Sequence, residues 1–333
     1  MEKTNYHPTM ADVAKEAGVA LGTVSKVVNN QRVGETYRQK VEDAIERLGY
    51  RYNNSGRALR TNQTGTIALI LPNTVHPYFA LLVHHINAAL SRRNYRMLLF
   101  LTQGDHSQEL ECIRLASQNR VDGIIALTYT PHLEIPEGIR FVTIDRFFSH
   151  SIPCVASDNF SGGQLAVHKL HEFGCRKLLL LHSTSALRNE PNKRKDGFVS
   201  ACEELKLSYQ TLQLVEENIT QTEVFEEFLA SHVHNGQFDF DGIFCCSDLV
   251  AWSAKCTMQR MNIRVPEDVQ IIGFDGIRMF GTHDYITSTI VQPVPEIAEV
   301  CVSTVLSEDF SSISSLICLP VKFAYGGTTK KQP

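Results

Sequence analysis

Two aspartates stand directly after apolar segments that have the composition of buried strands. Asp248 comes just after the run at 243–246, and Asp275 follows the run at 271–274. In an open α/β sheet, ligands bind at the carboxyl ends of the strands, and a carboxylate accepts hydrogen bonds from hydroxyl groups. The sequence therefore predicts a binding site for a polar small molecule at these strand ends.

The usual signatures of catalysis are absent from the chain. It has no G-x-S-x-G, no G-x-x-x-x-G-K-[ST] and no G-x-G-x-x-G motif. The histidine pairs 84/85 and 168/171 lack the cysteine or carboxylate partners of a metal site. We expect a protein that is not an enzyme, with no catalytic residue, no metal and no cofactor.

A second set of residues has the spacing of a helix-turn-helix. Thr9 is typical of a helix cap, and the helix it begins is expected to run to about Ala17. Gly18 suits the tight turn, and the helical pattern resumes at 23–29. A third helix, expected near 35–48, completes a three-helix module.

The second helix of such a module enters the major groove of DNA, and its first residues reach base edges. Leu21, Gly22 and Lys26 are the candidates for these base contacts. Three further polar residues are expected near the backbone phosphates: Thr23, Ser25 and Asn29. Thr9, at the start of the first helix, is a further DNA-binding candidate.

Net charge is divided unevenly along the 333 residues. The whole chain carries −4, but residues 1–63 carry +3 and residues 64–333 carry −7. A basic N-terminal part is compatible with nucleic-acid binding, because phosphates attract local positive charge.

No apolar stretch is long enough for a membrane span, and no signal peptide begins the chain. The nine cysteines form no CxxC pair. We expect a cytoplasmic protein without a membrane partner.

Beyond Thr66, continuous apolar runs alternate with helical stretches. The runs expected to be strands are 67–71, 97–101, 124–127, 141–144, 178–181 and 243–246. Continuous apolar strands separated by helices indicate buried parallel sheets. The segment is too long for one such sheet, so we expect two similar lobes.

The N-terminal residues resemble a known family. The segments MADVAKEAGV at 10–19, TVSKVVN at 23–29 and VEDAIERLGY at 41–50 look like the headpiece of the lac repressor and purine repressor family of bacterial transcription regulators. The resemblance implies a repressor that binds palindromic operator DNA as a homodimer, with a tetramer left open. It implies an all-α helix-turn-helix headpiece at 1–52, a hinge helix at 53–63, and an α/β domain at 64–333 that binds an effector and dimerises.

By the same resemblance, the hinge helix orders on DNA. Leu59 would wedge into the minor groove, and Arg57 or Arg60 would lie near phosphates. Gly56 stands where the family commonly has alanine, and glycine weakens a helix by about 1 kcal/mol. We therefore expect the free hinge to be weakly helical; a plain linker is the alternative.

The resemblance also implies two lobes with parallel sheets, like those of periplasmic binding proteins, and an effector between them. The expected lobes are about 64–173 with 291–320, and about 174–290 with 321–330. Arg194, Asp248 and Asp275 would hydrogen-bond the effector. Tyr78 and Phe79 would pack on its apolar face, and Arg188 or Ile219 would line the cleft. Carboxylates and a guanidinium beside aromatic rings suit a sugar.

A secreted solute-binding protein is the rival interpretation. It would need a secretion signal and would leave residues 9–62 without a role. Deletion of those residues separates the two, because a binding protein would keep its whole function.

Overall fold

The structure is a computed structural model. It describes residues 8–28, 31–50, 63–128, 130, 133, 135–149, 151–183, 189–214, 222–234, 236–279 and 282–331. The chain divides into two compact units, 1–64 and 65–333, and each is described by itself.

The first unit contains the three helices that the sequence predicts. They are α1 (Met10–Ala17), α2 (Leu21–Val28) and α3 (Glu35–Leu48), so α2 begins two residues before the expected 23. Thr9 and Asp12 form a capping box at α1, and Gly18 ends it with φ 64°. Gly49 ends α3 in the same left-handed conformation. Their shared core consists of Val13, Ala14, Ala17, Val24, Val27, Val41 and Ala44.

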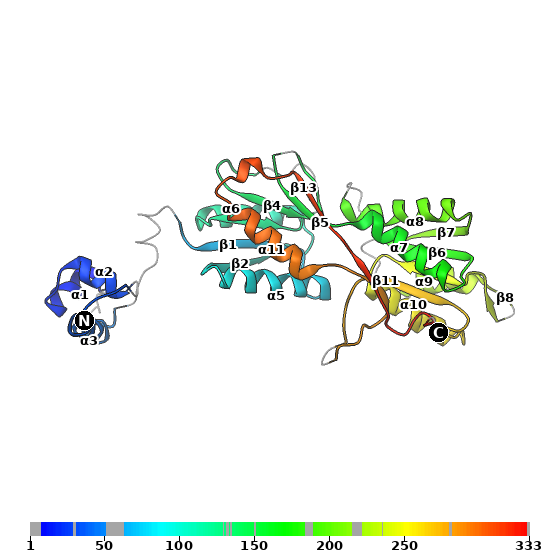
Figure 1. The fold of residues 1–333 in the computed structure, drawn as a ribbon, viewed down its shortest axis with the longest axis horizontal. Helices are drawn as coiled ribbons and strands as arrows, with labels where there is room; N and C mark the ends of the chain where they lie inside the picture. Colours follow the sequence, from blue (N-terminus) through cyan, green and yellow to red (C-terminus); the bar gives the residue numbers. More distant parts are fainter. Residues whose placement is uncertain are drawn as a thin grey trace. The chain divides into compact units, whose positions relative to one another are not determined.

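The second unit is built around two six-stranded sheets (Figure 1). The first sheet has the order β13-β5-β4-β3-β1-β2, and its strands pair in parallel. Its members are β1 (Thr66–Leu71), β2 (Arg96–Leu101), β3 (Gly123–Ala126), β4 (Phe141–Ile144), β5 (Cys154–Ser157) and β13 (Leu316–Leu319). Helices α5 (Pro77–Ser91) and α11 (Val294–Val305) pack on one face, and α6 (His106–Gln118) packs on the other.

The second sheet has the order β14-β12-β11-β10-β6-β7, parallel except for the β12–β14 pair. Its members are β6 (Lys177–Ser183), β7 (Ser208–Leu214), β10 (Gly242–Cys245), β11 (Gln270–Asp275), β12 (Ser288–Val291) and β14 (Lys322–Ala324). Helices α7 (Asn159–Glu172) and α8 (Lys193–Glu204) cover one face, while α9 (Thr222–Ser231) and α10 (Asp248–Arg260) cover the other. A small hairpin joins β8 (Val233–His234) to β9 (Gln237–Phe238).

The chain passes between the two lobes three times. The first passage differs from the expectation near Phe173: it follows β5 directly, at 158, because α7 packs on the second sheet through Ala166, Val167 and Leu170. The second passage lies between β12 and α11, and the third between β13 and β14. The helix α7 therefore belongs to the second lobe.

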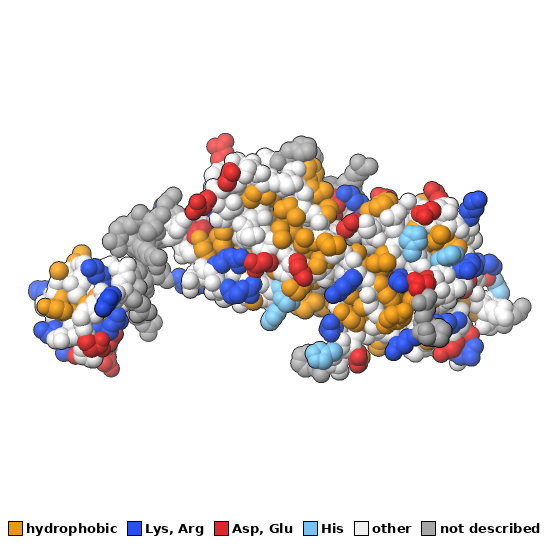
Figure 2. Space-filling view, viewed as in Figure 1, with side chains coloured by type: hydrophobic (Ala, Val, Ile, Leu, Met, Phe, Trp, Pro, Cys, Tyr) orange, Lys and Arg blue, Asp and Glu red, His pale blue; other side chains and the backbone are white. Residues whose placement is uncertain are grey.

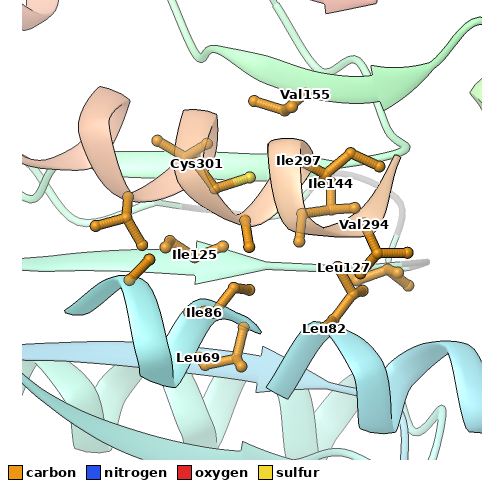
Figure 3. Close-up of a cluster of buried hydrophobic side chains, with 14 of the residues drawn as sticks. Leu69, Leu82, Ile86, Ile125, Leu127, Ile144, Val155, Val294, Ile297 and Cys301 are labelled. Atoms are coloured by element: carbon orange, nitrogen blue, oxygen red, sulfur yellow. The ribbon is translucent and has the colours of Figure 1, made fainter. Parts of the chain in front are cut away.

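The larger core of the first lobe lies between its sheet and the helices α5 and α11, and a smaller one lies under α6. Figure 3 shows Ile86 of α5 and Cys301 of α11 on either side of the strand residue Ile125, while Leu82 of α5 lies beside Leu127 and Ile297 of α11 lies beside Ile144. All of these side chains are buried. This packing joins α11, from near the end of the chain, to strands that lie far earlier in the sequence.

Among the described residues, no helix combines the length and apolarity that a membrane span requires.

Candidate functional site

Strand ends of both lobes bring a group of polar side chains together. Tyr78 begins the first turn of α5, and its hydroxyl donates to Asp145 Oδ2 at 3.3 Å. From the second lobe, Arg194 Nη1 lies 3.9 Å from Asp275 Oδ1. The backbone N–H of Glu190 donates to the Asp145 carbonyl at 2.9 Å, which joins the two lobes at this point. We call Tyr78, Asp145, Arg194 and Asp275 the interlobe cluster.

Arg194 is held rigidly within α8. Its Nε donates to Asn159 Oδ1 at 2.7 Å, and its Nη1 donates to the Cys246 carbonyl at 2.6 Å. The guanidinium lies over the Phe274 ring, 3.7 Å from the centroid. A planar cation fixed by two hydrogen bonds and an aromatic face is preorganised to bind a polar ligand.

Asp145 carries a buried carboxylate oxygen that forms no hydrogen bond with the described residues. This oxygen is Oδ1, and the whole side chain is buried. Burial, opposed in part by Arg194, raises the pKa of Asp145 to about 6. Burial, reinforced by Asp145, also raises the pKa of Tyr78 well above its ordinary value. A buried acceptor without a partner is costly, so a ligand that donates a hydrogen bond here would be stabilised.

Asp248 has both carboxylate oxygens engaged by the chain. Oδ2 accepts from the backbone N–H groups of Gly276 and Ile277 at 2.9 and 2.6 Å, and Oδ1 accepts from the Thr287 hydroxyl at 3.2 Å. Burial, with repulsion from Asp275, raises its pKa to about 8. Asp248 thus fixes the loop that follows Asp275.

A chain of hydrogen bonds runs from the interlobe cluster to the passages between the lobes. Gln292 Nε2 donates to Asp275 Oδ1, and the Ser157 hydroxyl donates to Gln292 Oε1, both at 2.7 Å. Ser157 ends β5 at the first passage and Gln292 begins the second. The cluster is therefore connected directly to two of the three connecting segments.

The other residues predicted to bind the effector have different surroundings. Phe79 is half-buried; its ring lies 5.1 Å from that of His76, and it packs against the core of the first lobe. Arg188 and Ile219 lie outside the described residues.

Three residues of this region were not predicted from sequence: Asp145, Asn159 and Gln292. Asp145 follows β4 and Gln292 follows β12, so the rule that pointed to Asp248 and Asp275 would have found both. Asn159 lies just beyond β5, at the start of α7.

A cavity of about 760 Å³ borders the cluster at Asp275 and is also lined by Gln292, which donates to Asp275. Its other walls are mostly apolar and come from α5, the loop after β11, and the second and third passages. Figure 2 shows hydrophobic side chains concentrated in this middle part of the second unit. No group of three or more metal-ligating side chains occurs within the described ranges.

In the first unit, α2 has one buried and one open face. Val24 and Val27 are in the core, whereas Leu21 is 51% exposed and Gly22 and Lys26 are exposed too. The open face carries the predicted base-contacting residues.

The other predicted DNA-binding residues have varied surroundings. Thr23 and Ser25 are half-buried. Thr9 donates its hydroxyl to Asp12 Oδ2 at 2.6 Å, within the cap of α1. Asn29, Arg57 and Leu59 lie outside the described residues, as does most of the predicted hinge helix.

Comparison with known proteins agrees with both units. Residues 9–53 match the family of bacterial regulatory proteins named after lacI, and residues 64–305 match the periplasmic binding proteins and sugar-binding domain of the same family. The sucrose operon repressor of Pediococcus pentosaceus is 31% identical over 327 residues, covering 96% of this chain and 99% of its own. The ribose operon repressor of Halalkalibacterium halodurans is 30% identical, covering 88% of this chain and 87% of its own.

Solved structures share the fold. The lac repressor bound to ONPG in its repressed state aligns with a TM-score of 0.81 at 19% identity, covering 97% of this chain and 100% of its own. A complex of the regulator CelR with cellobiose aligns with a TM-score of 0.65 at 22% identity over 97% of this chain and 100% of its own. The helix-turn-helix unit and the two-lobe α/β unit each match the corresponding domain of the lacI family, in the same order along the chain. This chain is therefore a DNA-binding transcription regulator that belongs to the lacI family.

Proposed function

We propose that a neutral sugar binds at the interlobe cluster and controls the affinity of the headpiece for operator DNA. The unpartnered Oδ1 of Asp145 carries this proposal, because it is a buried acceptor that a sugar hydroxyl would satisfy. Arg194 would donate to a ring or hydroxyl oxygen, and Asp275 would accept from a second hydroxyl. Tyr78 would contribute its hydroxyl as well as its ring.

Asp248 has a different part in this proposal. Because its oxygens already accept hydrogen bonds from Gly276, Ile277 and Thr287, we assign it to positioning the end of β11. It would act on the effector through Asp275. Phe79 would support Tyr78 and the first turn of α5, and Arg188 and Ile219 remain proposed lining residues.

Relatives support a sugar as the ligand class. The similar proteins include repressors of sucrose and ribose operons, and CelR binds cellobiose. Two carboxylates of the cluster, Asp145 and Asp275, would repel a phosphate group, so we favour an uncharged sugar. Thermal unfolding with a panel of neutral sugars tests this directly, since a ligand at 100 times its Kd adds about 2.7 kcal/mol of stability.

For the headpiece, we propose that α2 enters the major groove of a palindromic operator in a homodimer. The lac repressor has been solved as a dimer bound to its operator. Leu21, Gly22 and Lys26 would reach base edges, and Thr23, Ser25 and Asn29 would contact phosphates. Thr9 would help by fixing the start of α1 against the backbone.

We propose further that the segment 53–63 forms a hinge helix on DNA, with Leu59 in the minor groove and Arg57 near phosphates. Such a regulator acts in the cytoplasm, where operator DNA is found. Operator binding by a dimer, measured at several salt concentrations, tests the DNA half of the proposal. Affinity that did not fall as salt rises would contradict it, because phosphate contacts release counterions.

A further inference from the structure

A second cavity, of about 220 Å³, lies at the carboxyl end of the first sheet, beside the start of α6. Three of its wall residues directly follow β1, β2 and β3: Pro72, Thr102 and Leu127. None of its described wall residues belongs to the interlobe cluster or lines the larger cavity. Since a water molecule takes about 30 Å³ in the liquid, this separate cavity has room for a small organic molecule.

Glu109, in the first turns of α6, places a carboxylate in the wall of this cavity. The residue is only 4% exposed. Its Oε2 accepts a hydrogen bond from the Thr130 hydroxyl, but its Oε1 is buried and has no hydrogen-bond partner within the described part of the chain. A buried acceptor without a donor is unfavourable. A ligand that donates a hydrogen bond to Oε1 would therefore be stabilised.

The charge of Glu109 is not neutralised by direct contact either. Among the described residues, its carboxylate forms no ion pair. Arg146 interacts with it electrostatically, but the Arg146 guanidinium donates from Nη1 to the Thr128 carbonyl at 3.5 Å and lies over the Phe148 ring, 4.4 Å from the centroid. Buried carboxylates are normally paired with a cation. The cavity is therefore suited to a ligand that is both a hydrogen-bond donor and positively charged.

We propose that this cavity is a second small-molecule site, which binds a primary ammonium ion through an N–H hydrogen bond to Glu109 Oε1. A primary ammonium group carries three N–H donors and the charge that the carboxylate lacks. The Thr102 hydroxyl oxygen accepts from the Gly104 backbone N–H at 3.3 Å and has a second lone pair for the ligand. Pro72 and Leu127 would contact the carbon atoms that carry the ammonium group.

Titration calorimetry on the full chain, with ethylammonium chloride at fixed ionic strength, tests the proposal. One ethylammonium ion should bind per chain. Tetramethylammonium has the same charge but no N–H group, and ethanol has a donor but no charge. Because the site requires both properties, each of these should bind at least tenfold more weakly than ethylammonium.

Glu109→Gln should lower the affinity for ethylammonium at least tenfold, because the charge is removed. The fold should persist, since the amide oxygen can still accept from the Thr130 hydroxyl. Glu111→Gln is the matched control, because Glu111 is exposed on the same helix and pairs with Arg114. Asp145→Asn is the control for the interlobe cluster. Both control variants should bind ethylammonium like the parent.

A second variant avoids any dependence on a buried substitution. His106 is exposed, lines the cavity and precedes Glu109 by three residues on α6, a spacing at which helical side chains are neighbours. His106→Lys would bring its own ammonium group to Glu109, so ethylammonium should bind more weakly while the unfolding midpoint stays at or above the parent's.

Four results would overturn the inference. They are a parent that does not bind ethylammonium, equally tight binding of tetramethylammonium or ethanol, undiminished affinity in Glu109→Gln or His106→Lys, and a loss of affinity in Asp145→Asn or Glu111→Gln as large as that in Glu109→Gln. The proposed sugar site uses other residues, so its own tests are independent of these results.

Discussion

Gln292 donates a 2.7 Å hydrogen bond to Asp275 where the chain leaves the second lobe for the first, and it accepts one from Ser157 at the other side of the same junction. The end of β11 is thereby tied to two passages between the lobes. A ligand that moves Asp275 would also move Gln292 and Ser157, which lie in two of the segments that connect the lobes. We propose this connection as the route by which a bound effector acts on the segments between the lobes.

Ser157→Ala tests that route without altering the interlobe cluster. The change leaves Gln292 Oε1 buried without its donor and should cost about 1–3 kcal/mol of stability. It should also reduce the factor by which the sugar changes operator affinity. Urea unfolding and operator titrations measure the two effects. Ser303→Ala is the control, because Ser303 is exposed on α11 and its hydroxyl donates to the Val300 carbonyl of the same helix. Unchanged stability and coupling in Ser157→Ala would disprove the route.

The raised pKa of Asp145 makes a prediction about pH. Folding raises this pKa from its ordinary value of 3.8 to about 6, so the folded protein holds the proton more firmly than the unfolded chain. The resulting stabilisation is full below about pH 4 and is lost as pH rises through 6. Relative to the parent, Asp145→Asn should gain up to about 3 kcal/mol between pH 4 and pH 7. Urea unfolding across this range checks it, and a constant difference would refute the assignment.

In the headpiece, Lys26→Ala should weaken operator binding at least fivefold while the sugar binds as before. Lys26 is exposed on the open face of α2, so its loss should not disturb the core. Fluorescence anisotropy with a palindromic operator measures the change. Lys255→Ala is a control in the second unit, where Lys255 lies over Trp252. If the two variants bind operator equally well, α2 is not the helix that contacts the operator bases.

The hinge proposal predicts opposite effects from two substitutions. Leu59→Ala should lose operator affinity because the minor-groove wedge is removed, with the headpiece still folded. Gly56→Ala should gain up to about 1 kcal/mol of binding because alanine favours the helix before DNA arrives. Operator titrations of both variants decide the matter. No change in either would mean that the segment is a tether.

The strand and helix patterns predicted much of the fold, and the reasons for the failures are physical. Buried central strands such as β1 and β6 are continuous apolar runs, whereas the edge strand β7 has the mixed sequence SYQTLQL and gives no such signal. The apolar face of α7 is visible in sequence, but the sheet that it covers is not. That is why the first passage was misplaced.

The candidate site was predictable only in part. Asp275 and Arg194 were found from strand ends and family resemblance, and the structure brings them within 3.9 Å of each other. The unpartnered oxygen of Asp145 was not foreseeable, because it depends on which side chains from distant segments fail to reach it.

The most direct test of the account is operator affinity measured with and without the bound sugar, in the parent and in Arg194→Ala. In the parent, a saturating sugar should change operator affinity 5- to 150-fold, the range of a coupling free energy of about 1–3 kcal/mol. Arg194→Ala should bind operator like the sugar-free parent but lose the response, since sugar affinity falls at least tenfold. A sugar that binds the parent at the interlobe cluster and leaves operator affinity unchanged would contradict the account.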